Sequence, residues 1–221
     1  MKLLISAMLK FVVGVVLLGT LIFLPAGSFS YTGGWFFAGV LFVPVFVMGI
    51  LLFAKAPNLL KERLNGKEKE ADQKGVVAAS GLMFLAGFIV AGLDFRFGWS
   101  RMPIGVQITA VLLFLAGYGL YAEVLRENAY LSRTIKVQEG QKVVDSGLYG
   151  IVRHPMYMAT LLLFMMVPFI LGSWWAALPF AAYPVVIARR IKGEEALLCK
   201  ELEGYTAYTQ KVKYKLLPFI W

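Results

Sequence analysis

Long stretches without a charged side chain dominate this sequence and limit what it can fold into. Charged residues are absent from 35–53, 76–93 and 104–122, and the stretch Ile5–Leu24 is interrupted by Lys10 alone. About 20 apolar residues, at a rise of about 1.5 Å each, cross the ~30 Å hydrocarbon core of a bilayer as one helix. We therefore expect four transmembrane helices. A cleaved signal peptide is the alternative for the first stretch.

A fifth uncharged stretch, residues 156–188, is too long for one crossing. As a single helix its 33 residues would extend for about 50 Å. Pro168 and Gly172 interrupt its middle, and Trp174 and Trp175 follow as residues typical of a membrane interface. We expect a hairpin of two helices, with one kinked and strongly tilted helix as the alternative. The predicted fold is an all-α, polytopic integral membrane protein with four transmembrane helices, a C-terminal helical hairpin and a cytoplasmic amphipathic tail.

Lys and Arg are distributed unevenly between the connections. The formal net charge is +9, from 22 Lys+Arg against 13 Asp+Glu. If both termini face the cytoplasm, 20 of the 22 basic residues lie on that side, in the N-terminal stretch, in 54–75, in 123–155 and in the tail from Arg189. This skew predicts cytoplasmic termini and a hairpin that returns to the side where it begins. Because membrane topology explains the positive net charge, we expect no nucleic-acid partner.

The composition also limits the chemistry. One cysteine, Cys199, and one histidine, His154, exclude an internal disulfide and Cys-rich or multi-histidine metal sites, so no metal is expected. No separate soluble domain is apparent. We expect a single membrane domain over 1–221, with the four helices in 1–122 and a cofactor-binding loop, hairpin and tail in 123–221. The sequence carries no signal for an oligomeric state.

Two polar clusters, at 138–157 and 189–195, flank the predicted hairpin. Because the hairpin returns, its ends meet at one membrane face, and the two clusters form one candidate site. Pro155 favours a helix start, so we expect His154 at a helix N-terminus, where unpaired N–H groups and the helix dipole favour an anion. Arg153 adds positive charge there. The alternative is that Arg153 and His154 contact lipid headgroups.

The second cluster contains Arg190 and Glu194, which are neighbours on one face of a helix. An arginine at the membrane edge can hold a carboxylate through two hydrogen bonds, and a partly dry cavity strengthens that attraction. The alternative is an ordinary surface ion pair.

Three motifs surround these clusters. They read Gly147-x-Tyr149-x-x-x-Arg153-His154-Pro155-x-Tyr157, then Arg190-x-x-x-Glu194-Glu195, then Gly204-Tyr205-x-x-Tyr208 followed by Val212-x-Tyr214-x-Leu216-x-Pro218. In this order, and flanking a hydrophobic hairpin, they resemble the isoprenylcysteine carboxyl methyltransferase family. The resemblance covers about 135–221 and implies an integral-membrane methyltransferase that uses S-adenosyl-L-methionine.

The resemblance also implies roles for individual residues. The cofactor-binding candidates are Gln138, Gln141, Lys142, Val143, Val144, Tyr149, His154, Pro155, Met156, Tyr157 and Glu194. Arg190 falls where the family holds the substrate carboxylate, so Arg190 and Glu194 are the candidate catalytic residues. His154 is expected to meet the carboxylate of the cofactor, and Glu194 its cationic part. No general base is needed, because a carboxylate acceptor is already ionised at pH 7.

The predicted activity is therefore methyl transfer from S-adenosyl-L-methionine to the carboxylate of an isoprenoid-like or other lipidic substrate. Membrane lipids are the expected surroundings. A phospholipid N-methyltransferase is one alternative. An NADPH-dependent, sterol-reductase-like enzyme is another, because 212–221 also resembles the end of those enzymes. A membrane adaptor or transporter is disfavoured, since the transmembrane stretches contain almost no ionisable residue apart from Lys10.

Overall fold

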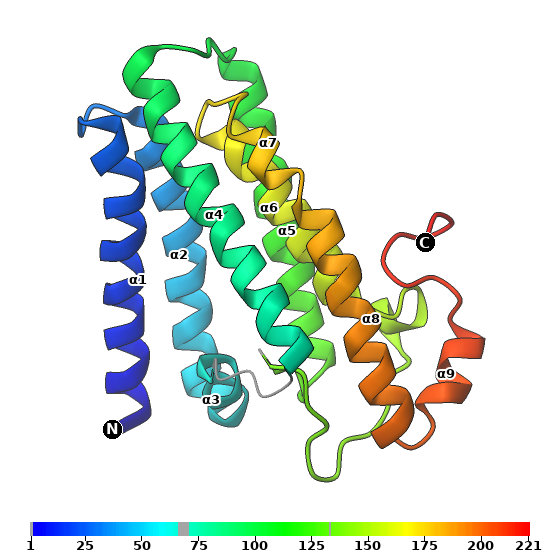
Figure 1. The fold of residues 1–221 in the computed structure, drawn as a ribbon. Helices are drawn as coiled ribbons and strands as arrows, with labels where there is room; N and C mark the ends of the chain where they lie inside the picture. Colours follow the sequence, from blue (N-terminus) through cyan, green and yellow to red (C-terminus); the bar gives the residue numbers. More distant parts are fainter. Residues whose placement is uncertain (1, 66–70, 133) are drawn as a thin grey trace.

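The computed structural model describes residues 2–65, 71–132 and 134–221, and the described chain consists of helices without a strand (Figure 1). The helices are α1 (Lys2–Ala26), α2 (Thr32–Lys55), α3 (Pro57–Leu64), α4 (Ala71–Phe97), α5 (Ile104–Glu127), the 3₁₀ turn η1 (Gly147–Gly150), α6 (Pro155–Ile170), α7 (Ala177–Phe180), α8 (Tyr183–Glu201) and α9 (Tyr205–Lys211). Lys67, Lys69 and Arg133, which the charge distribution includes, lie outside the described residues.

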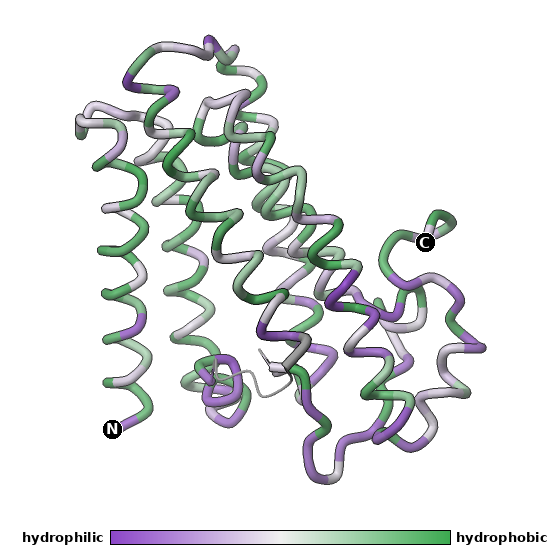
Figure 2. The backbone as a smooth tube through the Cα atoms, viewed as in Figure 1, coloured by the Kyte–Doolittle hydropathy of each residue, from purple (hydrophilic) through white to green (hydrophobic). Residues whose placement is uncertain are grey.

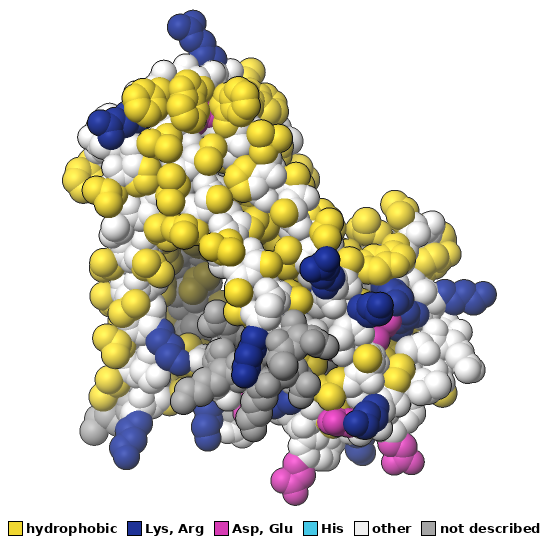
Figure 3. All heavy atoms as spheres, viewed as in Figure 1, with side chains coloured by type: hydrophobic (Ala, Val, Ile, Leu, Met, Phe, Trp, Pro, Cys, Tyr) yellow, Lys and Arg dark blue, Asp and Glu magenta, His cyan; other side chains and the backbone are white. Residues whose placement is uncertain are grey.

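Four of the described helices, α1, α2, α4 and α5, are long and apolar enough to cross a membrane. Their apolar side chains face outward as well as inward: Leu9, Val16, Leu82 and Leu112 are all more than 60% exposed. A helix of a water-soluble protein would bury one apolar stripe instead. Apolar residues cover the bundle, and most of the polar and basic ones gather toward its lower end (Figures 2 and 3). The predicted multi-pass membrane fold is confirmed.

The fifth stretch forms a hairpin rather than a kinked helix. Helix α6 leads away from the lower end of the bundle, α7 lies at the turn, and α8 returns beside α6 (Figure 1). Gly172 makes the turn with a φ of 76°, which favours glycine. The turn is fastened by the Tyr31 hydroxyl, which donates to the Leu171 carbonyl at 2.6 Å, and by the Ser173 hydroxyl, which donates to the buried carboxylate of Asp94.

The segments that carry the polar clusters meet at one end of the bundle. The N-terminus, α3, the connection after α5, both ends of the hairpin and α9 all lie toward this end (Figure 1). Helix α3 is absent from the sequence prediction, although Pro57 occupies its first turn and is a recognised start signal. Gly204, with a φ of 82°, turns the chain between α8 and α9. That this end faces the cytoplasm stays a prediction.

Candidate functional site

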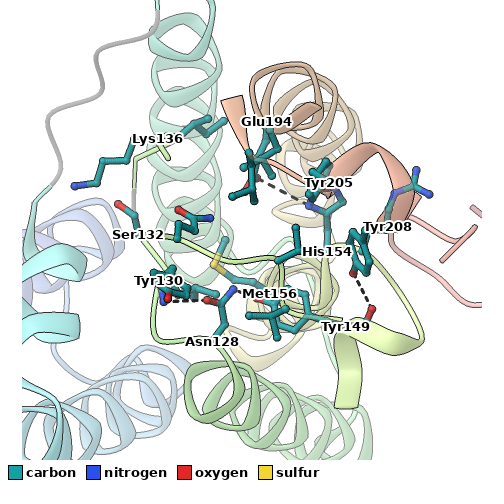
Figure 4. Close-up of a pocket in the computed structure, with 18 of the residues that line it drawn as sticks. Asn128, Tyr130, Ser132, Lys136, Tyr149, His154, Met156, Glu194, Tyr205 and Tyr208 are labelled. Atoms are coloured by element: carbon teal, nitrogen blue, oxygen red, sulfur yellow. Dashed lines mark hydrogen bonds and ion pairs between the residues drawn. The ribbon is translucent and has the colours of Figure 1, made fainter. Parts of the chain in front are cut away.

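A pocket lies where the connection after α5, η1, α6, α8 and α9 converge (Figure 4). Nine of the eleven predicted cofactor-binding residues line it: Gln141, Lys142, Val143, Val144, Tyr149, His154, Met156, Tyr157 and Glu194. The two polar clusters, separated by the whole hairpin in the sequence, therefore form one site, as expected. What these residues bind stays a prediction.

Tyr149 is positioned on the floor of the pocket by η1. Gly147 begins this turn with a φ of 55°, and the space that a Cβ would need is taken by the Glu127 carboxylate. That carboxylate accepts the Leu148 N–H at 2.9 Å and so caps the turn. The Tyr149 hydroxyl accepts a hydrogen bond from the Asn128 side chain at 2.9 Å. A glycine at 147 is thus required for the acid to approach the backbone.

Glu195 lies behind the pocket and binds three side chains through their nitrogen atoms. Its carboxylate accepts from Arg153 Nε at 2.6 Å, from His154 Nε2 at 3.2 Å and from Lys215 Nζ at 2.8 Å. Burial alone would raise the pKa of Glu195, but the hydrogen bonds from His154, Arg153 and Lys215 outweigh it and hold the pKa well below its usual range. Glu195 is therefore a permanent anion.

Arg153 lines the pocket, but protein acceptors occupy its guanidinium. Besides binding Glu195, its Nη1 donates to the carbonyls of Val212 and Lys213 at 2.6 and 3.1 Å. The side chain is 7% exposed. A buried guanidinium needs several acceptors, and the tail after α9 supplies them. Arg153 thus fastens the tail to the start of α6.

His154 lies at the N-terminus of α6, as predicted, but its backbone N–H is occupied. It donates to the Lys215 carbonyl at 2.9 Å, next to a matching bond from Arg153 N to Tyr214 O. The helix N-terminus is therefore covered by the tail and is not open to an anion at this position. The His154 ring still lines the pocket, with Nδ1 4.0 Å from Glu194 Oε2.

Two polar atoms in the pocket wall lack a hydrogen-bond partner among the described residues. They are Glu194 Oε2 and the Tyr205 hydroxyl, and both are buried. In Figure 4, Glu194 reaches into the pocket from α8, and Tyr205 from α9. Burial, and next the charge of Glu194, raise the pKa of Tyr205 far above its usual range, so it stays a neutral hydroxyl. Buried polar groups are rarely left unsatisfied, so these atoms indicate a position for a ligand.

Three predicted site residues lie outside the described lining of the pocket. Gln138 stabilises the preceding loop, where its side-chain amide donates to the Tyr130 carbonyl at 2.5 Å. Pro155 is buried in the first turn of α6. Arg190 lies behind the wall, where its Nε donates to the Tyr157 hydroxyl at 3.1 Å. Arg190 therefore reaches the pocket through Tyr157.

Other pocket residues are missing from the sequence-based site. Tyr205 and Tyr208 of α9 form one wall, and the Tyr208 hydroxyl donates to the Tyr149 carbonyl at 2.7 Å. Arg63 of α3 touches the opposite part of the lining, where its Nη1 donates to the Ser132 carbonyl at 3.1 Å. Tyr205 and Tyr208 belong to the third sequence motif, so the sequence contained a signal that they lie at the site. No local pattern connects Arg63 with a segment almost 70 residues away.

The pocket is small in this conformation. Its cavity volume is about 90 Å³, whereas sites for drug-sized ligands usually have about 300–1,000 Å³. Described residues of the connection between α5 and η1 line one side, and Lys136 among them is held by Glu62 of α3 at 2.5 Å. A drug-sized ligand therefore requires the lining to rearrange.

Two comparisons of the sequence with known proteins gave matches. Residues 108–200 match the sequence model of the Isoprenylcysteine carboxyl methyltransferase (ICMT) family. A Delta(14)-sterol reductase of Methylotuvimicrobium alcaliphilum is 25% identical over 135 residues, which cover 54% of this chain and 32% of that protein. The chain thus spans about a third of the length of this curated relative. The resemblance predicted from the sequence is confirmed: residues 108–200 of this membrane protein are similar to the ICMT family.

Proposed function

We propose that this chain is a membrane methyltransferase that transfers the methyl group of S-adenosyl-L-methionine to the carboxylate of a lipidic substrate. The observation that carries the proposal is the buried Oε2 of Glu194 in the pocket wall, which accepts no hydrogen bond from the described residues. A buried carboxyl oxygen without a donor favours a ligand that carries donors or positive charge. S-adenosyl-L-methionine has a sulfonium and an ammonium group, and the resemblance to the ICMT family makes it the expected cofactor.

The other lining residues fit the remaining parts of such a cofactor. The neutral Tyr205 hydroxyl can donate to or accept from a ribose hydroxyl. The rings of Tyr149, Tyr157 and Tyr208 supply aromatic faces and edges for adenine and for a sulfonium. His154, held by Glu195, is proposed to meet the amino-acid end. Glu195 already positions His154, and η1 already positions Tyr149.

The chemistry that the chain must support is simple. When bound, the cofactor supplies a methyl group whose S–C bond breaks as an O–C bond to the carboxylate forms, leaving a neutral thioether and no proton to transfer. Arg190, hydrogen-bonded to Tyr157, is proposed to orient the acceptor carboxylate. The acceptor carboxylate loses water when cofactor and lipidic substrate fill the pocket, so positioning and desolvation are the proposed sources of catalysis.

Calorimetry on the detergent-solubilised protein tests the cofactor assignment. We expect S-adenosyl-L-methionine to bind, and Glu194→Gln to weaken its binding about tenfold, because a charge-assisted contact is lost. S-adenosylhomocysteine has no sulfonium charge but keeps the ammonium group, so a much smaller loss for it would place Glu194 at the sulfonium and equal losses would place it at the ammonium. Glu201→Gln, on the exposed end of α8, is the matched control. Unchanged binding of both ligands in Glu194→Gln would contradict the assigned role of Glu194.

A transfer assay tests the acceptor. Lipid extracts are incubated with the cofactor carrying a radiolabelled methyl group, and the products are treated with alkali. A carboxyl ester releases labelled methanol, whereas a methylated amine retains its label. Arg190→Ala should reduce transfer about 100-fold while cofactor binding is retained. Alkali-stable label would instead identify a phospholipid N-methyltransferase.

A reductase is the second candidate, because the curated relative is a Delta(14)-sterol reductase. The nucleotide of such an enzyme would bring several phosphate charges toward the Glu194 carboxylate, which is unfavourable. Calorimetry with NADPH separates the two candidates. Binding of NADPH without binding of S-adenosyl-L-methionine would overturn the proposed methyltransferase.

A further inference from the structure

The chain after α9 folds into a compact tail loop, residues 215–221, which is not part of the described lining of the pocket. We infer that the apolar tip of this tail loop inserts into the bilayer at the end of the bundle where the pocket lies, and that it thereby holds the α9 wall of the pocket against the membrane. The partner of this surface is the lipid bilayer itself. The inference goes beyond the proposed function, because it does not depend on what the pocket binds.

The tip of the tail loop exposes large apolar side chains. Phe219 and Ile220 are 87% and 78% exposed, more than any other large apolar side chain that the structure describes, and Trp221 is 41% exposed. Val16 and Leu112, on helices that span the membrane, are each 62% exposed. Contiguous exposed apolar side chains outside a spanning helix mark a surface that contacts a membrane or another protein.

The tip faces the space beside the bundle that lipid fills. In Figure 1 the chain rises after α9, so the tail loop lies at the level of the spanning helices and does not project below them. In Figure 3 apolar side chains gather on the upper surface of the lobe that α9 and the tail loop form, and open space lies above this surface. Because the neighbouring bundle is apolar on its outside, lipid occupies that space in a membrane.

The backbone of the tail loop is suited to an apolar environment. The N–H groups of Leu216 and Leu217 donate to Trp221 O at 2.9 and 3.1 Å. Those of Ile220 and Trp221 donate to Leu217 O at 3.2 and 3.1 Å, and Pro218 has no N–H to satisfy. A backbone group that enters hydrocarbon without a partner is costly. The tail loop satisfies these groups internally, so its tip can leave water at little cost.

Contacts within the tail fix the shape of the tip. The ring centres of Phe219 and Tyr214 lie 5.4 Å apart, and Lys215 Nζ lies 5.7 Å from the centre of the Trp221 ring. Phe219 has a φ of 65°, in the left-handed region that bulky residues rarely adopt and that surrounding contacts must maintain. A tip that is already shaped loses little conformational entropy when it docks.

Basic residues lie beside the tip, where lipid headgroups surround an inserted segment. Lys213 is exposed just before the tail loop. Lys215 binds Glu195 at 2.8 Å and so places the tail loop beside α8, on which Arg189 and Lys192 are exposed. In Figure 3, Lys and Arg side chains gather directly below the apolar surface of the lobe. An apolar tip above a basic band is typical of a segment in the membrane interface and favours anionic lipids.

Insertion of the tip bears on the pocket through the residues that precede it. The carbonyls of Tyr214 and Lys215 accept the N–H groups of Arg153 and His154 at 2.9 Å each. Val212 is buried in one cluster with the tyrosines of α9. A tip that is fixed in the bilayer therefore restrains both the segment that covers the start of α6 and the α9 wall.

Spin labels on single cysteines test the insertion. The full-length protein, with Cys199→Ser as the background, is placed in vesicles of phosphatidylcholine and phosphatidylglycerol. A label at Ile220→Cys should collide more with oxygen, which dissolves in hydrocarbon, than with a water-soluble nickel chelate. A label at Leu112→Cys on α5 should behave in the same way, and one at Thr206→Cys, exposed on α9, should show the reverse.

Two results would overturn the inference. Nickel accessibility at position 220 as high as at position 206 would place the tip in water. Low accessibility to both reagents at position 220 would place the tip against protein, such as a second copy of this chain.

A substitution at the tip tests the apolar contact itself. Asparagine tolerates a positive φ, so Phe219→Asn keeps the shape of the tail loop and removes its most exposed apolar side chain. The label at Ile220→Cys should then become more accessible to nickel. Phe29→Asn is the matched control, because Phe29 is 75% exposed in the connection between α1 and α2, at the other end of the bundle. An unchanged label in Phe219→Asn would overturn the role of this ring as an anchor.

Hydrogen exchange in the same vesicles tests the effect on the pocket wall. Phe219→Asn should raise amide exchange at 205–217, because the bilayer no longer restrains the tail, and Phe29→Asn should leave it unchanged. Unchanged exchange in Phe219→Asn, with the label moved into water, would overturn the restraint of the wall. Neither measurement uses a cofactor or a methyl acceptor, so a failure of the proposed function would leave both results valid.

Discussion

Glu195 connects the start of α6, the helix α8 and the tail through one carboxylate. It is 13% exposed and faces Arg153, His154 and Lys215. Because Glu195 and its partners come from three segments, its loss affects the pocket wall and the tail together. Glu195→Gln leaves Arg153 buried without a counter-ion, so we expect unfolding to become easier by about 3 kcal/mol. Thermal unfolding in detergent measures this effect.

The same carboxylate predicts a pH dependence. The pKa of Glu195 is lowered in the folded protein, so the unfolded chain takes up the proton first as the pH falls. The stabilisation is complete above about pH 4.3, the usual value for a glutamate, and is lost below it. The difference between wild type and Glu195→Gln should therefore be constant from pH 5 to 8 and shrink in stronger acid. Glu203→Gln, on the exposed end of the same segment, serves as the control.

At the scale of elements, α1 and α4 pack closely through glycine. A Cβ at Gly92 would lie 2.8 Å from the Ile22 carbonyl oxygen and 2.9 Å from the Ala26 nitrogen. Such contacts are too short, and backbone atoms cannot move aside as side chains can. Gly92→Ala should therefore separate the two helices at a cost of about 1–3 kcal/mol.

Thermal stability in detergent measures this cost, with Gly81→Ala as the control, because a Cβ there meets no atom within 4 Å. Alanine favours a helix over glycine, so the control should be neutral or slightly stabilising. A Gly92→Ala variant as stable as the control would mean that the contact between α1 and α4 is looser than the structure indicates.

At the scale of the molecule, α3 is bonded to the connection between α5 and η1, part of which lines the pocket. Its Arg63 and Glu62 hold Ser132 and Lys136 of this connection. The pocket has too little volume for the proposed cofactor, so binding must rearrange the lining. We expect saturating S-adenosylhomocysteine to change amide hydrogen exchange in 134–146 and in α9.

Hydrogen exchange followed by mass spectrometry measures this change, with the distant turn at 171–176 as the internal control. Leu171, Ser173 and Ala176 of this turn are buried, and hydrogen bonds with Tyr31 and Asp94 hold it, so its amides should exchange equally with and without ligand. A change confined to that turn would place the ligand elsewhere.

Much of the fold was predictable because the decisive interactions are local. A membrane helix needs only a long enough apolar stretch, and all four predicted spans match α1, α2, α4 and α5. The break around Gly172 and the skew of basic residues together predicted the hairpin. That hairpin in turn brought Tyr149 and Glu194 into one pocket across 44 intervening residues.

The sequence by itself thus determined the membrane spans, the returning hairpin and the segments that meet at the site. Only the tertiary structure decided how each charge is used. Arg153 binds Glu195 and the tail, His154 has its N–H covered, and Glu194 Oε2 is left without a hydrogen bond from the described residues. The physical reason is that a buried charge is satisfied by whichever acceptors the fold brings within about 3 Å, and those acceptors lie far away in the sequence.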